Sequence, residues 1–381
     1  MNFPTRFLFF FLLLAFAGQI HFCSAEEIRF FVGTYTGGQS RGIYSATLNT
    51  ETGKVSKPEL VAEMTNPSFL AIHPGNGHLY AVGETTDYGG QKSGSVAAFS
   101  IQPETGRLTL LNERPSRGGA PCHLVVNREG TQVLFANYVG GNVGTLPILA
   151  NGSLGEKSFL VQHQGSSVTP RQQGPHAHSI NLDAKNNHAV AADLGLDKLI
   201  TYRLTNAGKL IRVAEHSETP GAGPRHFVFH PNGRFGYLLN EMNATVSALS
   251  YAPQSGKFES LQTLPTLPGE FKGRKSCAEV RIHPTGKFLY CSNRGHDSIA
   301  VYQILDSGKM KRVEIIKTGG QEPRNFVLDP SGKFLLAENQ KSDSITVFKI
   351  HPTTGRLTAS GQPVYCPTPV CIRFLNTKKT D

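Results

Sequence analysis

Short apolar runs separated by polar turns recur along most of the chain. The stretch GPRHFVFHPNGRFGYLLNE at residues 223–241 is typical, because two apolar runs flank a Pro-Asn-Gly turn and charged residues stand at both open ends. Apolar runs of this length around such a turn predict a β-hairpin. Five further stretches share this layout, at residues 66–84, 120–138, 175–194, 277–294 and 322–340.

The repeat continues beyond each hairpin. A third apolar run usually follows, and a turn such as TGRL, AGKL or SGKM leads to a fourth. The period of about 50 residues is that of a four-stranded propeller blade. A seventh repeat is split, because PVCIRF at 369–374 lacks partner strands nearby, whereas the apolar runs at 28–35 and 42–48 lie at the other end of the chain.

Joining the two ends of the chain would close a ring and leave no exposed strand edge. The pattern therefore predicts an all-β fold. We expect residues 26–381 to form a single seven-bladed β-propeller with four-stranded antiparallel blades, closed by pairing of the N- and C-terminal strands.

The first 25 residues do not fit the repeat. Arg6 precedes the apolar run FLFFFLLLAFAG at 7–18, and the small residues CSA follow at 23–25. This is the layout of a signal peptide, and the run is shorter than the ~20 residues that span a bilayer. We expect residues 1–25 to be cleaved, leaving an exported protein, periplasmic or secreted, without a membrane attachment. An uncleaved anchor is the alternative.

The chain is basic. It has 38 Lys and Arg against 28 Asp and Glu, a net charge of +10 at pH 7, and only one of these charges lies in the leader. The excess is spread out, with no run of five basic residues. It suits a small anionic molecule, and we expect no nucleic-acid partner.

Five cysteines remain after the leader is removed: Cys122, Cys277, Cys291, Cys366 and Cys371. The odd number excludes complete internal pairing, and the spacings match no zinc pattern. We expect these cysteines to be small buried residues near strand ends. A disulfide across one hairpin, between Cys277 and Cys291, is the alternative.

The hairpin register predicts which side chains meet at the channel. In a propeller the first strand of each blade is innermost, so residues just before it and just after the second strand meet at one mouth. Counted from the last residue of each first strand, the position five places earlier holds Ser68, Cys122, His178, Arg225, Ala278 and Arg324. The position eleven places later holds Glu84, Tyr138, Leu194, Glu241, Arg294 and Gln340.

These two variable positions predict a chemically active mouth. Paired arginines bind a carboxylate, a phosphate or a developing oxyanion, and a carboxylate or an imidazole activates water. A solvated rim of mixed charge is the alternative. The position ten places later is nearly always Asn or Asp, including Asn293, which suits a repeated backbone contact.

Metal, cofactor and covalent chemistry are not expected. His176, His178 and Asp193 offer three ligands without a supporting motif, and no Ser or Cys at the mouth is followed by a nucleophile-elbow motif. The Gly-rich segments GTYTGG (33–38) and YVGGNVG (138–144) open no helix, so we interpret them as blade turns.

Six segments carry a family resemblance: FVGTYT (31–36), ANYVGGNV (136–143), GPHAHS (174–179), GPRHFVFHPNGRFGYLLNE (223–241), SNRGHDSIAVY (292–302) and PVCIRF (369–374). In this order they resemble the seven-bladed propeller lactonase family, which includes propeller-type 6-phosphogluconolactonases and carboxy-muconate lactonising enzymes. The resemblance implies active-site groups at Arg225, Glu241, Arg294 and one histidine. The register favours His178 over His176, because His178 shares a position with Arg225.

The resemblance implies metal-independent hydrolysis of a small anionic sugar lactone, 6-phosphogluconolactone or a related aldonolactone. Arg225 and Arg294 would polarise the carbonyl, and Glu241 or His178 would activate water. Further substrate contacts are expected from four residues: Arg324, His176, His226 and Asn293. The alternatives are a non-catalytic exported propeller that binds a glycan or a protein, and a lactonising cycloisomerase. Because 6-phosphogluconolactone is a cytosolic intermediate, the predicted export leaves the particular lactone open.

Overall fold

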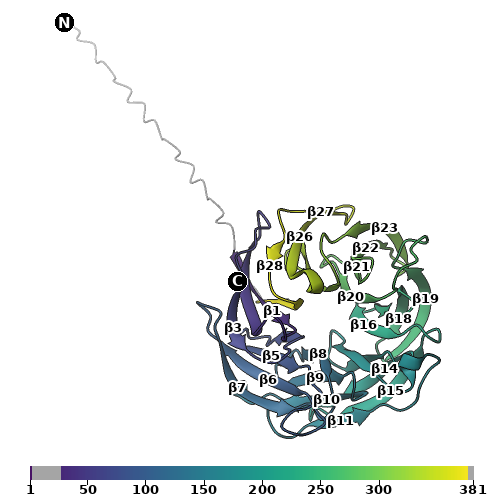
Figure 1. Cartoon of the computed structure of the whole chain (residues 1–381). Helices are drawn as coiled ribbons and strands as arrows, with labels where there is room; N and C mark the ends of the chain where they lie inside the picture. The colour runs from purple at the N-terminus through teal and green to yellow at the C-terminus, as the bar shows by residue number, and fades with distance from the viewer. Residues whose placement is uncertain (2–26, 376–381) are drawn as a thin grey trace.

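A computed structural model of the chain describes Met1 and residues 27–375. Apart from Met1, the predicted leader at residues 1–25 lies outside the described residues. Across residues 27–375 the strands form seven antiparallel sheets, arranged as blades around a central channel (Figure 1). This confirms the all-β, seven-bladed propeller. No helix in the described part of the chain is long and apolar enough to cross a membrane.

Each blade runs outward from its innermost strand. Blade 1 contains β4 (Leu70–Ile72), β5 (His78–Gly83), β6 (Ser95–Ile101) and β7 (Leu108–Pro115). Blade 2 contains β8 (Pro121–Val126), β9 (Gln132–Asn137), β10 (Asn142–Pro147) and β11 (Phe159–Gln162). Blade 3 contains β12 (Ala177–Leu182), β13 (His188–Asp193), β14 (Lys198–Leu204) and β15 (Leu210–Ser217). Blades 4 and 5 contain β16 (Pro224–Phe229), β17 (Phe235–Asn240), β18 (Thr245–Ala252), β19 (Lys257–Pro265); and β20 (Cys277–Ile282), β21 (Phe288–Asn293), β22 (Ser298–Ile304), β23 (Met310–Lys317).

Blades 6 and 7 complete the ring. They contain β24 (Pro323–Leu328), β25 (Phe334–Asn339), β26 (Ser344–Ile350), with β27 (Leu357–Ala359) and β28 (Val364–Tyr365) both paired to β26; and β29 (Pro369–Phe374), β1 (Glu27–Thr34), β2 (Gly42–Asn49), β3 (Glu59–Glu63). Two single-turn 3-10 helices, Pro170–Gln172 and Gln340–Ser342, are the helical elements of the described residues.

The ring is closed as the split repeat predicts. Strand β29 from the C-terminal end pairs antiparallel with β1 from the N-terminal end, with Val32 opposite Ile372. Ile372 is fully buried in a cluster that joins blade 7 to blade 6. The pairing therefore satisfies the edge of β1 and also buries apolar surface between blades.

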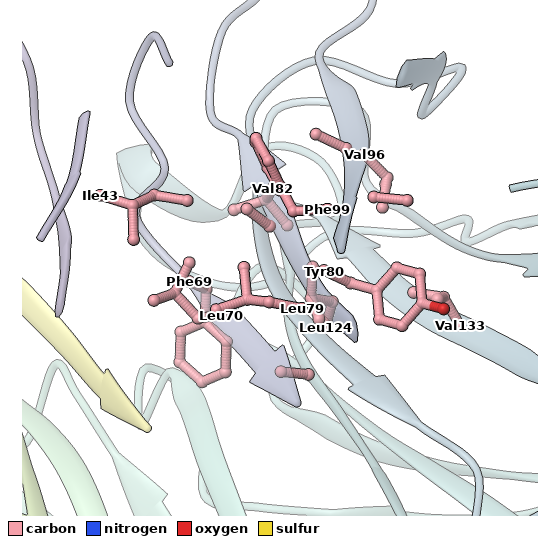
Figure 2. Packing of buried hydrophobic residues seen from close by; sticks show 14 of the residues in the cluster. Ile43, Phe69, Leu70, Leu79, Tyr80, Val82, Val96, Phe99, Leu124 and Val133 are labelled. Atoms are coloured by element: carbon pink, nitrogen blue, oxygen red, sulfur yellow. The ribbon is translucent and has the colours of Figure 1, made fainter. Parts of the chain in front are cut away.

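The hydrophobic core lies between the blades. Four consecutive residues of β5, Leu79 to Val82, are all buried, because both faces of a blade pack against neighbouring blades. Figure 2 shows Leu79 and Tyr80 of blade 1 among Ile43 of blade 7 and Leu124 and Val133 of blade 2. This two-sided burial explains why the second strands are continuous apolar runs instead of alternating ones.

Hydrogen bonds repeat between neighbouring blades. Tyr80, Tyr237 and Tyr290 occupy one position of the second strand and donate to glycine carbonyls of the next blade at 2.9–3.0 Å. His230 in the turn of blade 4 contacts the carbonyl of Gly286, whose φ of +76° suits glycine. The turn histidine is thus structural.

All five cysteines of the described residues are buried and free, as expected for small core residues. The alternative of a Cys277–Cys291 disulfide is therefore wrong for this structure.

Removing side-chain volume from the closing strand should weaken the whole ring. We expect Ile372→Ala to lower the free energy of unfolding by about 2–4 kcal/mol, because it leaves a cavity where the two ends of the chain meet. Leu110→Ala on the outer strand β7, where the side chain is 54% exposed, is the control and should cost less than ~0.5 kcal/mol. Urea denaturation measures both, and equal losses would contradict the closure argument.

Candidate active site

A β-bulge recurs near the start of the innermost strands. In blade 4 the pairing register shifts between Pro224 and His226, so Arg225 is the extra residue. The same shift leaves Cys122, His178 and Arg324 unpaired in blades 2, 3 and 6. Bulges re-aim side chains and are common beside active sites. The bulges therefore direct the variable position of the repeat toward the channel.

Glu241 lies at the centre of the predicted site. Its Oε2 is 3.0 Å from Nε of Arg225 and 3.0 Å from Nη2 of Arg294. Its Oε1 accepts a 2.7 Å hydrogen bond from Nη1 of Arg171. Nε2 of His178 lies 4.0 Å from Oε2. The structure thus brings together the four predicted catalytic residues, and the Glu241 side chain is only 5% exposed.

The two buried arginines are held by backbone carbonyls of β20 in blade 5. Nη1 of Arg225 donates to the carbonyl of Ala278, and Nη2 of Arg294 donates to the carbonyl of Cys277 at 3.2 Å. The Nε groups of both arginines and Oε2 of Glu241 make no geometrically acceptable hydrogen bond within the described residues, although the ions are close. Buried donors with unused capacity are suited to a ligand oxygen.

Charges at the site set the protonation states. Burial alone would raise the pKa of Glu241, but Arg294 and Arg225 lower it below the ordinary range, so the carboxylate stays ionised. Burial and the charge of Arg225 hold the pKa of His178 well below its usual value. Burial lowers the pKa of Arg294 to about 10, which leaves it protonated at pH 7. The site therefore contains a neutral imidazole beside a fully compensated carboxylate.

A second group of side chains faces the first across the channel. The hydroxyl of Tyr35 donates to Oε2 of Glu84 at 2.7 Å and accepts from Nη2 of Arg324 at 2.8 Å. Ser68 also donates to Glu84. Arg225 and Arg324 both line a narrow pocket of about 10 Å³, which is the space of a single water molecule. An oxygen atom in this pocket would lie beside two guanidinium groups.

All four expected substrate contacts lie outside the Glu241 cluster. His176 stacks on Tyr138 at the mouth, with ring centroids 4.5 Å apart. Nδ1 of His226 is 3.2 Å from Glu279, deeper in the channel, although His226 also lines the pocket. Asn293 bonds to Thr266 and Ser298 of its own surroundings, so its side chain serves the backbone as the Asn/Asp position predicts. Arg324 lines the pocket with Arg225 and donates to the hydroxyl of Tyr35.

Two site residues were not predicted. Tyr35 belongs to GTYTGG, which we interpreted as a blade turn, but it follows the second strand of blade 7 and so holds the same repeat position as Glu241. Extending the register count across the split repeat would have found it. Arg171 comes from the connection between blades 2 and 3, where no repeat applies. Its contact with Glu241, 70 residues away, has no signal in the sequence.

Cys122, His178 and Glu241 lie in the order of a catalytic triad. Sγ of Cys122 is 3.7 Å from Nδ1 of His178, whose Nε2 faces Glu241. Burial raises the pKa of the Cys122 thiol far above its usual value, and the arginines already neutralise Glu241. A protonated thiol is a poor nucleophile.

Within the described residues, no group of three His, Cys, Asp or Glu side chains is arranged to hold a metal ion.

Below the site, a polar cluster occupies the inner strands. Arg281 contacts Glu279, and Arg373 lies over the ring of Phe69 at 4.5 Å. Glu338 is fully buried nearby, and its two oxygens have no hydrogen-bond partner in the described part of the chain. Burial raises the pKa of Glu338 to about 8, so the group is mainly protonated at pH 7.

The fold and the site together define a seven-bladed β-propeller enzyme with four arginines and two glutamates at one mouth of its channel. The chain belongs to the family described as "Lactonase, 7-bladed beta-propeller", which it matches over residues 29–374. It is therefore a lactonase.

Known proteins resemble it along nearly their whole length. The chain is 40% identical over 347 residues to the 6-phosphogluconolactonase of Bacillus subtilis, covering 91% of this chain and 98% of that relative. It is 34% identical over 308 residues to the 6-phosphogluconolactonase of Formosa agariphila, covering 78% and 86%. The solved structure of a periplasmic gluconolactonase from Pseudomonas aeruginosa superposes with a TM-score of 0.87 at 32% identity, covering 92% and 99%.

The buried carboxyl of Glu338 should make stability depend on pH. Because its folded pKa of about 8 exceeds the ordinary 4.5, its protonated form favours folding below pH 4.5, and this advantage is lost as the pH rises toward 8. Glu338→Gln keeps the shape and removes the charge. We expect it to raise the free energy of unfolding by about 1–3 kcal/mol at pH 8 and by much less at pH 5.

Urea denaturation at the two pH values measures this effect. Glu59→Gln, which changes an exposed glutamate of β3, is the control and should change stability little at either pH. Equal effects of Glu338→Gln at pH 5 and pH 8 would show that the carboxyl is not protonated in the folded protein.

Proposed function

We propose that the enzyme hydrolyses an aldonolactone that carries an anionic group, such as 6-phosphogluconolactone, at the channel mouth. The observation that carries the proposal is the charge of the site. The site contains four arginines, Arg171, Arg225, Arg294 and Arg324, but only two glutamates, Glu84 and Glu241. The excess of two positive charges favours an anionic substrate. The names of the Bacillus and Formosa relatives support the same substrate class.

The proposed mechanism is direct attack by water without a metal. The unpartnered N–H groups of Arg225 and Arg294 stabilise the oxyanion that forms when water adds to the lactone carbonyl. Neutral His178 accepts the proton of the water, because Glu241 is too strongly compensated to do so. The bond between the carbonyl carbon and the ring oxygen then breaks, and His178 returns the proton to the ring oxygen. The product is the open aldonic acid.

We also propose that the enzyme acts outside the cytosol. The leader at residues 1–25 supports export, and the Pseudomonas protein of similar structure is named as periplasmic. Because 6-phosphogluconolactone is a cytosolic intermediate, the proposed substrate class also includes an aldonolactone with a terminal carboxylate. N-terminal sequencing of the protein recovered from outside the cytosol tests this, and an intact N-terminus would contradict cleavage.

Single substitutions test the assigned roles. We expect Arg225→Ala and Arg294→Ala each to lower kcat/KM for 6-phosphogluconolactone by about 10²–10³-fold, because each removes an oxyanion donor. His178→Ala should lower kcat by about 10²-fold through loss of the proton acceptor. Arg234→Ala, at the exposed turn of the hairpin that carries Arg225, is the control. Wild-type rates in all three variants would show that the site is misplaced.

Two further measurements test the mechanism. A chelator should not change the rate if water attacks without a metal. Intact-mass analysis of samples quenched during turnover should show no adduct, because the thiol of Cys122 stays protonated. An acyl group on Cys122 would instead establish covalent catalysis.

A further inference from the structure

The connection between blades 2 and 3 carries an arginine into the active site. Residues 163–176 join β11 to β12 and include the 3-10 helix Pro170–Gln172. From this helix, Arg171 donates through Nη1 to Oε1 of Glu241 at 2.7 Å and through Nε to the hydroxyl of Tyr138 at 2.8 Å. Its guanidinium also lies over the Tyr138 ring, 5.7 Å from the centroid.

The backbone of this connection is firmly held. Gln172 is fully buried and donates through Nε2 to the carbonyl of Leu194 at 2.8 Å. Ser167 donates through Oγ to Asp197 at 2.6 Å. Asp197 also accepts from the backbone N–H of Gly223, two residues before Arg225. The Asp197 carboxylate thus holds both the Arg171 connection and the strand of Arg225. When a ligand enters the mouth, we therefore expect the Arg171 side chain to move while the backbone stays in place.

Arg171 differs from the other two arginines on Glu241 in its exposure. The Arg171 side chain is 45% exposed, whereas those of Arg225 and Arg294 are 3% and 7% exposed. No hydrogen bond from its Nη2 to another described residue is found, so this nitrogen is free to bind a ligand. An anion that enters the mouth would therefore meet Arg171 before it meets the buried arginines.

The position of Arg171 links substrate binding to proton transfer. It neutralises Glu241 in the free enzyme, and its charge is one of those that keep the pKa of Glu241 low. An anion that competes for Arg171 would leave Glu241 less compensated. Glu241 lies 4.0 Å from His178, so the uncovered negative charge would make the imidazole a better proton acceptor.

We propose that Arg171 determines specificity by moving its hydrogen bond from Glu241 to an anionic group, a phosphate or a carboxylate, on the far end of the lactone. This movement frees Oε1 of Glu241 and strengthens His178 as the proton acceptor. Lactones without such a group leave Arg171 on Glu241 and react more slowly. The inference rests on the lactone hydrolysis proposed above, and its test includes a measurement that does not require activity.

Binding of reaction products tests the recognition step. Arg171→Met keeps a long apolar side chain over Tyr138 and removes the charge. Arg274→Met is the matched control, because Arg274 lies on the connection between blades 4 and 5 (residues 266–276), is 55% exposed and pairs with Glu322 instead of Glu241. Calorimetry with 6-phosphogluconate, glucarate and gluconate separates a phosphate, a second carboxylate and no second anion.

We expect the wild type to bind one or both of the products with a second anionic group at least ~10-fold more tightly than gluconate. Arg171→Met should reduce this preference by about 10-fold, and Arg274→Met should preserve it. Preference for 6-phosphogluconate alone would identify phosphate as the recognised group, and preference for glucarate would identify carboxylate. The inference is wrong if Arg171→Met keeps the wild-type preference or weakens all three products equally.

Kinetics test the link to His178, with spontaneous lactone opening subtracted. In the wild type, kcat for 6-phosphogluconolactone should exceed that for gluconolactone. The acid limb of the pH profile for 6-phosphogluconolactone should lie at higher pH than that for gluconolactone, because a better proton acceptor holds its proton to higher pH. In Arg171→Met the two profiles should coincide, and the ratio of kcat values should fall toward one. If the two pH profiles already coincide in the wild type, the link to His178 is wrong. A merely structural role of Arg171 would change the rates of both substrates alike.

The two proposals fail in different ways. If the wild type opens no lactone but binds products in the Arg171-dependent pattern, the proposed reaction is wrong and anion recognition by Arg171 stands. If it opens lactones but its selectivity does not depend on Arg171, the reaction stands and the inference is wrong.

Discussion

The pairing of β29 with β1 is the contact on which the rest of the molecule depends. It holds the first and last blades together, and the resulting ring brings seven innermost strands to one channel. Glu241 and Arg294 approach within 3.0 Å although they belong to different blades, because the packed blades fix the distance between their strands. The candidate active site therefore depends on ring closure, whereas a site built from the loops of a single blade would not.

Charge compensation is the second constraint. A buried carboxylate and buried guanidinium groups are costly to desolvate, and the cost is tolerable only when they are paired. Glu241 compensates Arg225 and Arg294 in this way, and each arginine also donates to one backbone carbonyl of blade 5. Neither Nε group makes a well-aligned hydrogen bond, and His178 is neutral, so the same arrangement offers the oxyanion donors and the proton acceptor of the proposed mechanism.

Much of this could be predicted because the repeat is regular. A register counted from each hairpin turn located His178, Arg225, Glu241 and Arg294, and the bulge that re-aims the first two falls at the same place in their blades. The count failed in two ways. It was not carried across the split blade, which hid Tyr35, and it does not apply to connections between blades, which hid Arg171.

The sequence by itself determined the blade number, the strand order and the way the ring closes, because apolar periodicity and turn residues are local signals that repeat seven times. Only the tertiary structure decided which polar residues pair and which remain free. His226 and His178 both come from bulged inner strands, yet one contacts Glu279 deep in the channel and the other faces Glu241 at the mouth. Such differences arise from the burial and charge of neighbours that are distant in the chain, and these quantities exist only once the blades have packed.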